Sequence, residues 1–261
     1  MKPCFKYSGG KTKELKNILP LPEFTGYFIE PFAGGAAVAF ALERPSILTD
    51  IRDNVIVFYE QLRDNPDEIL DTIELWKTMD INEREKLYYT LRDDFYGTSD
   101  KMMQALRWLF IRQQVFSGMD RVNSSGKMNA AFGWYKNFTT NTSMAHSDFL
   151  KKCVIKKQSF VDTISQASED DFIFLDPPYL ERNSDYGNDN DDGRSEKLHR
   201  ELADALKTTK AKWLLIHSDC ELYRELYKDY SIKLNGHCYS QNFKGRDNSN
   251  SKVQHLYISN Y

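Results

Sequence analysis

Cysteine and histidine are scarce in this sequence, and neither residue type is grouped. The 261 residues include four cysteines and five histidines. Cys4, Cys153, Cys220 and Cys238 form no C-x-x-C pair, and the histidines show no spacing typical of metal ligands. A zinc site or a disulfide framework is therefore not expected. We predict reduced thiols in a cytosolic protein without a metal.

Long apolar runs are missing as well. No stretch approaches the roughly 20 apolar residues that a membrane span requires, and the first residues lack a signal-peptide pattern. Hydrophobic residues make up 41% of the chain and charged residues 28%, which is typical of a globular protein. The length suffices for one α/β domain with a smaller domain or a large insert, and no membrane partner is expected.

An excess of positive charge is also absent. The net charge is −3, which does not favour a protein that binds nucleic acid over its whole surface. The charge is unevenly distributed, because residues 107–137 contain five basic residues and one acid, whereas residues 181–196 contain six acids and two bases. The first segment is predicted to contact phosphates, and the second is predicted to form a mobile polar lid.

The most informative stretch is Asp176-Pro177-Pro178-Tyr179. It follows the four apolar residues Phe172–Leu175, which are typical of a strand buried on both faces of a parallel sheet. The two prolines end this strand, because proline cannot donate a hydrogen bond to a ladder. A carboxylate, two rigid carbonyls and an aromatic ring thereby lie at the carboxyl end of a strand, where open α/β sheets bind ligands.

These groups suit the methylation of an amino group on an aromatic ring. The lone pair of such an amine is delocalised into the ring, which makes the nitrogen a poor nucleophile. The Asp176 carboxylate and a carbonyl can accept its two N–H hydrogens and draw the nitrogen toward tetrahedral geometry, while Tyr179 stacks on the ring. A sulfonium methyl donor needs no metal. The alternative is a plain strand end at which Asp176 caps a nearby turn.

Three other patterns predict a cofactor pocket. Residues 27–42 read as a strand, a Gly-Gly turn at Gly34 and a helix of small residues, the first βα unit of a nucleotide-binding sheet. Asp50 ends the next strand, near the spacing at which an acid binds ribose hydroxyls; a helix cap is the alternative. Tyr7 and Lys11 flank a Ser-Gly-Gly loop, which is either a cofactor clamp or a flexible tail. The complete G-x-G-x-x-G fingerprint is missing, which disfavours a dehydrogenase.

The middle of the chain predicts helices and then a hairpin. Residues 52–118 show no strand alternation and are predicted to be helical, with a variant capping box formed by Asn82 and Glu85. Residues 122–128 predict a hairpin closed by a Ser-Ser-Gly loop. Its basic and asparagine side chains suit a groove of DNA, although a solvated basic loop is the alternative.

Taken in order, these patterns resemble the Dam-type, D12 class adenine-specific DNA methyltransferases, which use S-adenosylmethionine. The resemblance runs from K-Y-S-G-G-K at Lys6 through F-I-E-P-F-A-G-G at Phe28 and the acid Asp50 to D-P-P-Y at Asp176, and ends with F-K-G-R and S-N-Y. It covers most of the chain, and the ordered set is far more specific than D-P-P-Y alone. It implies an α/β fold: a Rossmann-like methyltransferase sheet with helices on both faces and a mainly helical recognition insert with a hairpin.

The resemblance also implies a domain division and roles for individual residues. Residues 1–52 and 150–261 would form the catalytic domain that binds S-adenosylmethionine, and residues 53–149 the target-recognition insert. The implied catalytic residues are Asp176, Pro177, Pro178 and Tyr179. The implied cofactor contacts are Tyr7, Lys11, Glu30, Pro31, Phe32, Gly34, Asp50, Ser159, Phe160 and Asp176. The residues expected to bind DNA are Arg121, Asn123, Lys127, Lys136, Lys244 and Arg246.

The implied activity is methyl transfer from S-adenosylmethionine to N6 of an adenine flipped out of a short duplex DNA sequence. GATC is the expected sequence, although residues 122–131 differ from the family's GATC-reading pattern. The expected partner is double-stranded DNA, and we expect a monomer or weak dimer in the cytoplasm of a bacterial or phage-infected cell. The alternatives are methylation of cytosine N4 or of an RNA adenine, and a catalytically silent DNA-binding relative. Asp rather than Ser at position 176 favours adenine.

Overall fold

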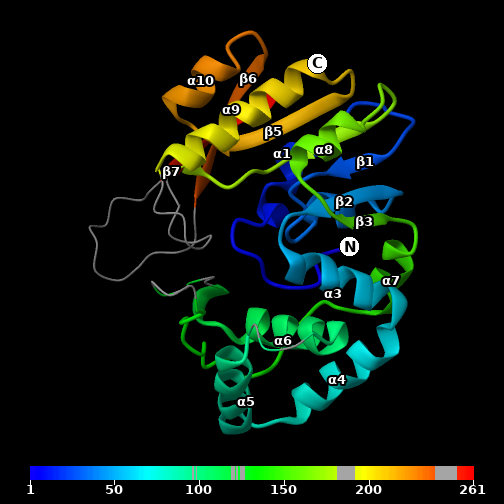
Figure 1. Ribbon diagram of the computed structural model, residues 1–261, viewed down its shortest axis with the longest axis vertical. Coiled ribbons are helices and arrows are strands. Elements are labelled where there is room, and N and C mark those ends of the chain that lie inside the picture. Colours follow the sequence, from blue (N-terminus) through cyan, green and yellow to red (C-terminus); the bar gives the residue numbers. More distant parts are fainter. Residues whose placement is uncertain are drawn as a thin grey trace.

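The computed structural model describes residues 1–95, 97, 99–118, 121, 123, 127–180, 192–238 and 252–261. In this part of the chain seven strands form one sheet in the order β3-β2-β1-β4-β5-β7-β6 (Figure 1). The strands are β1 (Phe28–Glu30), β2 (Ser46–Asp50), β3 (Val154–Lys157), β4 (Phe172–Leu175), β5 (Lys212–Ser218), β6 (Ser231–Cys238) and β7 (Lys252–Ser259). Strands β3, β2, β1, β4 and β5 are parallel, and β7 runs antiparallel to both β5 and β6.

The strand order reverses between β1 and β4. From β1 the chain continues outward to β2 and β3, whereas β4 and β5 lie on the other side of β1. Loops that leave the carboxyl ends of β1 and β4 therefore diverge, and such a reversal is where an open α/β sheet binds its ligand. The predicted Rossmann-like α/β sheet is confirmed, and the glycine turn and the D-P-P-Y stretch flank its reversal point.

Helices cover both faces of this sheet (Figure 1). The described residues form α1 (Leu15–Ile18), α2 (Ala37–Leu42), α3 (Asp53–Asp64), α4 (Pro66–Thr78), α5 (Ile81–Asp93), α6 (Lys101–Gln114), α7 (Met144–Leu150), α8 (Phe160–Ser165), α9 (Asp192–Thr208) and α10 (Glu221–Leu226), and the 3₁₀ turns η1 (Lys11–Lys13) and η2 (Phe116–Gly118). One face packs against α2, α3 and α7, and the other against α8, α9 and α10.

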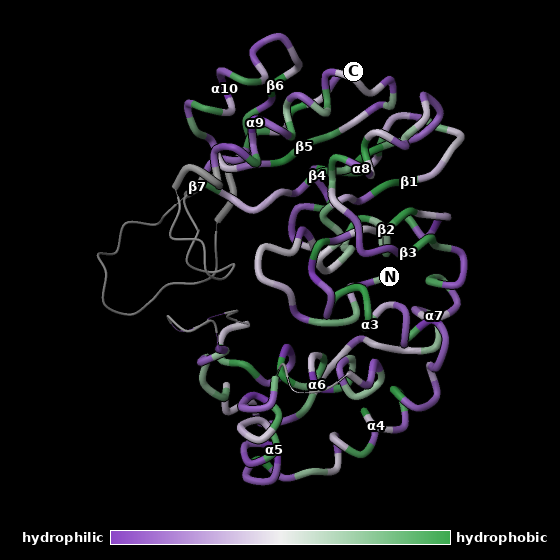
Figure 2. Tube along the Cα trace, viewed as in Figure 1, coloured by the Kyte–Doolittle hydropathy of each residue, from purple (hydrophilic) through white to green (hydrophobic). Residues whose placement is uncertain are grey.

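The sheet separates two hydrophobic cores, and β4 contributes to both. Phe172 and Phe174 belong to the core beside α2 and α3, whereas Ile173 and Leu175 belong to the core beside α8 and α9. Successive side chains of a strand point to opposite faces, so a strand buried on both sides needs four apolar residues in a row. Hydrophobic residues likewise lie along β1 and β5 (Figure 2). The strand predicted from Phe172–Leu175 is confirmed.

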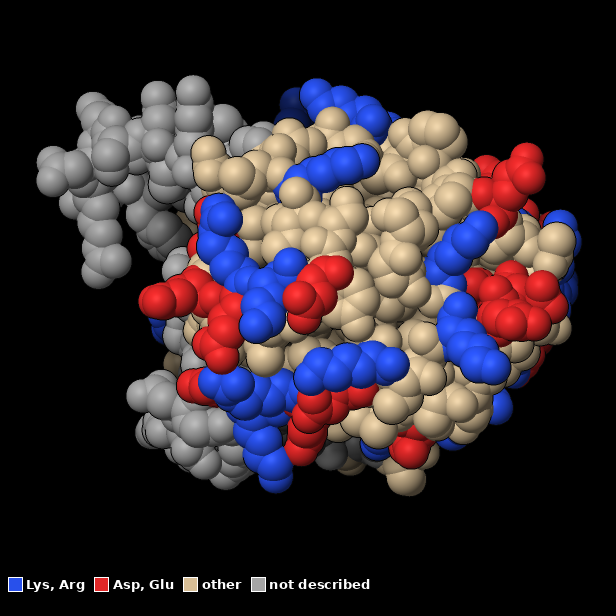
Figure 3. All heavy atoms as spheres, turned by 90° about the horizontal axis from the view of Figure 1, so that it is seen from above, with Lys and Arg blue, Asp and Glu red and all other residues tan. Residues whose placement is uncertain are grey.

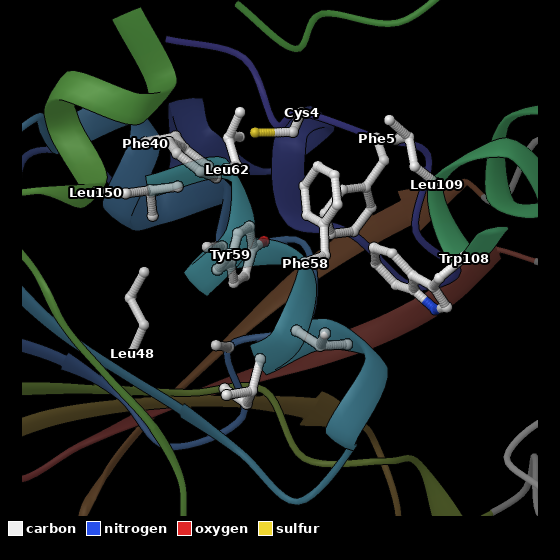
Figure 4. Close-up of a cluster of buried hydrophobic side chains, with 14 of the residues drawn as sticks. Cys4, Phe5, Phe40, Leu48, Phe58, Tyr59, Leu62, Trp108, Leu109 and Leu150 are labelled. Carbon is white, nitrogen blue, oxygen red and sulfur yellow. The ribbon is translucent and has the colours of Figure 1, made fainter. Parts of the chain in front are cut away.

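The N-terminal segment is anchored in the larger core. The ring of Phe5 lies edge-on to Trp108 of α6 at 4.5 Å between centroids and edge-on to Phe58 of α3 at 5.3 Å (Figure 4). Phe5 is 4% exposed. The interpretation of this segment as a flexible tail is therefore wrong, because an aromatic anchor buried between two helices fixes the chain just before Tyr7.

The helical segment between β2 and β3 begins where it was predicted. Helix α3 packs on β2 and β3 and also on α6, whereas α5 packs on α6 at the far end of the molecule (Figure 1). The division of the chain at residues 53 and 149 stays a prediction. Within the described residues, no helix combines the length and the apolar composition that crossing a membrane requires.

The capping box of α5 lies two residues earlier than predicted. Asp80, not Asn82, is the N-cap: its carboxylate accepts from the backbone N–H groups of Asn82 at 2.7 Å and Glu83 at 2.9 Å. The Glu83 carboxylate accepts in return from the Asp80 N–H at 2.7 Å. The predicted pair, Asn82 and Glu85, has the same three-residue spacing, but the helix begins at Ile81, so Asn82 already lies in its first turn and is not the N-cap.

Candidate active site

A cavity of about 500 Å³ lies at the reversal point of the sheet. This volume falls within the range of small-molecule sites. It is lined by all the residues predicted to be catalytic or to bind the cofactor: Tyr7, Lys11, Glu30, Pro31, Phe32, Gly34, Asp50, Ser159, Phe160, Asp176, Pro177, Pro178 and Tyr179. The structure thus brings together residues from five separate stretches of sequence, and their individual roles stay predictions.

The glycine turn after β1 allows the Tyr7 ring to approach the backbone. Gly34 has a positive φ of 44°, and a Cβ placed there would lie 2.7 Å from the Tyr7 ring. Both the positive φ and this close approach exclude a residue with a side chain at position 34. The Tyr7 hydroxyl accepts a hydrogen bond from Arg52 at 3.4 Å, and the Tyr59 hydroxyl donates to the Gly34 carbonyl at 2.8 Å. The turn is therefore held on both sides and shapes one wall of the cavity.

Asp50 is fixed at the carboxyl end of β2 by two backbone groups. One carboxylate oxygen accepts from the Gly34 N–H at 2.9 Å, and the other accepts from the Arg52 N–H at 2.9 Å. The side chain is buried, and burial raises its pKa despite these hydrogen bonds and the Arg52 charge. Each oxygen keeps a second lone pair, so the carboxylate can also accept from a ligand hydroxyl.

Glu30 is a buried acid with one oxygen still available. Its Oε1 accepts from the Ala39 N–H at 3.3 Å, whereas its Oε2 is buried and has no hydrogen-bond partner among the described residues. Burial, together with the nearby Asp176 charge, raises the pKa of Glu30 to about 8. A buried, unpaired acceptor that lines a cavity is a group that a cationic ligand would stabilise.

Lys11 and Asp176 form an ion pair across the cavity. Lys11 Nζ lies 2.6 Å from the Asp176 carboxylate, and the two side chains are 4% and 22% exposed. Lys11 also donates to the Gly9 carbonyl at 3.1 Å. Burial raises the pKa of Asp176, and the Lys11 charge opposes this shift. The pair therefore keeps a carboxylate at the end of β4, where water alone would hydrate it poorly.

The Tyr179 ring is held by the rings of two histidines. His217 of β5 lies 4.8 Å from it and His255 of β7 lies 5.5 Å from it, both edge-on. Lys11 Nζ lies 5.1 Å from the centroid of Tyr179. Aromatic rings favour edge-to-face contacts over a face-to-face sandwich, and such contacts fix orientation as well as position. The ring is 7% exposed and lines the cavity.

The opposite wall of the cavity is formed by the start of α8. The Phe160 ring stacks on Phe32 at 5.3 Å. The Ser159 hydroxyl caps α8 by accepting from the Asp162 N–H at 3.1 Å. Ser159 thus has a local structural role, and the flat apolar surface beside it comes from the two phenylalanines. Such a surface suits the face of a planar ring.

The predicted hairpin forms in the residues that the structure describes. The Asn123 N–H donates to the Lys127 carbonyl at 2.8 Å, and the Asn129 N–H donates to the Arg121 carbonyl at 3.0 Å. Arg121 and Lys127 are exposed. The hairpin loop at 124–126, the basic residues Lys244 and Arg246, and most of the acidic segment 181–196 lie outside the described residues.

Two exposed aromatic residues beside the hairpin were missed by the sequence analysis. Phe116 and Trp134 are 49% and 57% exposed, and they flank the bridge between Val115 and Phe132 at the hairpin base. Trp134 and Ser117 both have positive φ, so the backbone here is strained. The signal that could have found them is an aromatic residue next to a Ser-Gly or Gly turn in a basic segment. Exposed rings of this kind can stack on bases.

Buried polar residues behind Tyr179 were also missed. Glu14, His255 and Tyr257 form a hydrogen-bonded cluster whose members are far apart in the sequence. Among the described residues, no three His, Cys, Asp or Glu side chains are grouped so that they could hold a metal ion. The side chains that line the cavity include carboxylates, an ammonium group and aromatic rings.

Comparison with known proteins places the chain among DNA methyltransferases. The model of the D12 class N6 adenine-specific DNA methyltransferase family matches residues 7–241. The chain is 34% identical, over the full length of both proteins, to the type II methyltransferase M.CviBI of Paramecium bursaria Chlorella virus NC1A. It is 30% identical to the type II methyltransferase M1.LlaDCHI of Lactococcus lactis subsp. cremoris, covering 100% of this chain and 96% of the relative. It is 29% identical to the retron Ec67 DNA adenine methylase of Escherichia coli, covering 88% and 82%.

Proposed function

The chain belongs to the D12 class N6 adenine-specific DNA methyltransferase family, and we propose that it transfers a methyl group from S-adenosylmethionine to N6 of an adenine flipped out of duplex DNA. The family predicted from the ordered motifs is thereby confirmed. The observation that carries the proposal is the cavity at the reversal point of the sheet, where a buried acid with one unpartnered oxygen, an ion pair and a held aromatic ring meet.

The residues of the cavity fit S-adenosylmethionine. The orphaned Glu30 Oε2 is suited to accept from the α-ammonium group, and Lys11 to pair with the α-carboxylate. Asp50 is suited to accept from the ribose hydroxyls, and Phe160 to cover the adenine. The cofactor supplies a methyl group that its sulfonium has already activated. The chain's task is then to orient it and to exclude water.

The D-P-P-Y stretch is suited to the target adenine. Asp176 and the Pro177 carbonyl can accept the two N6 hydrogens, which localises the nitrogen lone pair toward the methyl group. Tyr179 offers its face to the base, because two histidines contact its ring edge-on and hold it in place. The base must leave the helix to reach these groups, and Phe116 could fill the space that it leaves in the stack.

We propose that DNA lies against the hairpin rather than against the outer surface of α9. The surface of α9 carries ion pairs at helical spacing, such as Arg200–Glu196 and Lys207–Asp204. Figure 3 shows positive and negative side chains intermixed on the face of the molecule that is seen from above. Such a surface offers phosphates little net attraction. The exposed Arg121, Lys127 and Lys136 are suited to this role.

The proposed target sequence is GATC, and it rests on the family resemblance. Single-molecule sequencing of DNA from a host that expresses the protein identifies the modified base and its motif together. N6-methyladenine in one recurring sequence supports the proposed activity. N4-methylcytosine, or modified RNA adenine with unmodified DNA, would favour the alternative ring-amine reactions instead.

S-adenosylmethionine binding should release close to one proton at pH 7. Glu30, with a pKa of about 8, is mostly protonated there, and an ammonium group beside it would lower that pKa well below 7, so that the bound form retains little of this proton. The affinity for S-adenosylmethionine should therefore rise between pH 6 and pH 8, because Glu30 loses the proton that competes with the ammonium group. Titration calorimetry in buffers of different ionisation enthalpy measures the proton count. Glu30→Gln should bind more weakly and release none, whereas the surface variant Glu74→Gln should match the wild type. Equal proton release by wild type and Glu30→Gln would contradict the proposed role.

Lys136→Ala should flatten the salt dependence of DNA binding by about one unit of slope, because each lost phosphate contact releases one counterion fewer. Arg121→Ala and Asn123→Ala should instead relax sequence preference at one position, by about 1–3 kcal/mol. A salt series of binding constants and methylation of a randomised library separate the two effects. Lys207→Ala, on the mixed surface of α9, is the control and should change neither. If Arg121→Ala, Asn123→Ala and Lys136→Ala all behave like this control, DNA is read elsewhere.

A further inference from the structure

A buried polar cluster lies directly behind the proposed target-base pocket. Glu14 Oε2 accepts hydrogen bonds from His255 Nδ1 and from the Tyr257 hydroxyl, both at 2.7 Å. The Glu14 and His255 side chains are 5% and 1% exposed. Glu14 follows η1, and the other two residues are two positions apart on β7, so they point to the same face. The cluster therefore joins the start of the chain to the strand beside β5.

The cluster contacts Tyr179 on one side and Lys11 on the other. The His255 ring contacts the Tyr179 ring edge-on at 5.5 Å. The Glu14 backbone N–H donates to the Lys11 carbonyl at 2.9 Å, and Lys11 in turn pairs with Asp176. Burial raises the pKa of Glu14, but the His255 hydrogen bond, the Lys11 charge and the Tyr257 hydrogen bond outweigh it, so the pKa is lowered. Glu14 is thus a buried anion that accepts from two donors. The His255 ring is fixed by its bond to this anion.

A buried carboxylate with two donors is a costly way to fill a core. Replacing such a group by apolar residues of similar size is often neutral or stabilising, so stability alone is a weak reason for its presence. It does, however, fix the orientation of each ring that it binds, because a hydrogen bond is directional where apolar packing is not. Glu14 orients the His255 ring in this way, and the His255 ring contacts the Tyr179 ring.

We propose that Glu14 and His255 are positioning residues for methyl transfer, and that they act by holding the Tyr179 ring at the angle that stacks on the target base. Glu14 orients His255, and His255 orients Tyr179. Tyr257 fixes Glu14 through its hydroxyl group. The inference rests on the proposed function and deepens it, because it assigns to the flipped base a pocket whose shape depends on β7.

A double-mutant cycle tests this inference. His255→Gln should lower kcat by about 10- to 100-fold, since a small misplacement of a substrate-positioning group costs up to this much. In a Tyr179→Ala background the same substitution should change kcat by less than about twofold, because the ring through which it acts is gone. S-adenosylmethionine affinity should be unchanged in His255→Gln. Glu14→Gln keeps the size of the side chain and one acceptor, so it should show the same pattern with a smaller loss of kcat. It replaces His255→Gln in this test if that variant does not fold.

The control is His146→Gln. His146 is also a buried histidine with two hydrogen bonds, to Ser143 and to the Lys2 carbonyl, but it lies on α7 away from the cavity. His146→Gln should lower the melting temperature without changing kcat. An equal loss of kcat from His255→Gln in both backgrounds would show a merely structural role and overturn this inference alone. If Tyr179→Ala itself leaves kcat unchanged, both this inference and the proposed role of Tyr179 fail.

Discussion

Replacing Asp176 with alanine should lower turnover at least ~100-fold while leaving the fold intact. The substitution removes the charged acceptor for the target amine, and preorganised polar groups of this kind supply about 3 kcal/mol or more of transition-state stabilisation. It also leaves Lys11 without the carboxylate at 2.6 Å that balances its charge. Single-turnover methylation of a duplex substrate measures the effect on the chemical step without product release.

Asp219 provides a matched control for this experiment. It follows β5, the strand next to β4, and its side chain is 24% exposed, against 22% for Asp176. Its partner is Arg224, on the surface of α10. Asp219→Ala should therefore change turnover by less than about threefold, because the loss of an exposed ion pair costs at most ~1 kcal/mol of stability. A kcat of Asp176→Ala within threefold of wild type would remove Asp176 from the mechanism.

Arg84→Leu should lower the free energy of unfolding by about 3 kcal/mol or more. Arg84 is 1% exposed, and its guanidinium donates to Gln114 Oε1 at 3.2 Å and to the carbonyls of Tyr135 at 3.1 Å and Lys136 at 2.7 Å. Leucine would leave one buried acceptor, at Gln114, and two part-buried carbonyls without their donor, and a buried acceptor without a donor costs about 1–3 kcal/mol. Urea unfolding followed by circular dichroism measures the loss.

The same variant should also weaken DNA binding more than cofactor binding. The carbonyls that Arg84 holds belong to the segment that leaves the hairpin, whereas Arg84 does not line the cavity. Arg63→Leu is the control: Arg63 is 28% exposed and pairs with the adjacent Asp64, so its loss should cost less than about 1 kcal/mol. Equal destabilisation by the two variants would refute the anchoring role of Arg84.

The features predictable from the sequence are those that depend on neighbouring residues. Four apolar residues before two prolines predict both β4 and its end, and a glycine pair after an apolar run predicts the turn at Gly34. Strand ends in a parallel sheet meet at one edge, so the predicted residues could be expected in one cavity without knowledge of the strand order. The local rules for turns and strands were sufficient to predict β4, the turn at Gly34 and the residues that line the cavity.

The features that escaped prediction depend on contacts between distant residues. Glu14 and His255 are 241 positions apart, and neither side chain carries a local signal of the other. The burial of Phe5 between α3 and α6 likewise depends on packing that the N-terminal sequence does not record. The sequence offers two pairs with the spacing of a capping box, and the structure uses Asp80 and Glu83 because the helix begins at Ile81.

The order of the strands in the sheet bears on how the protein is made. Strand β7 leaves the ribosome after β5 and β6, yet it lies between them. Until it emerges, β5 has an open edge and β6 has not joined the sheet, and such unpaired edges invite association between nascent chains. The Tyr179 ring also lacks its contact with His255 until then. Synthesis of β7 is therefore the step at which a growing chain acquires both a closed sheet and a complete target-base pocket.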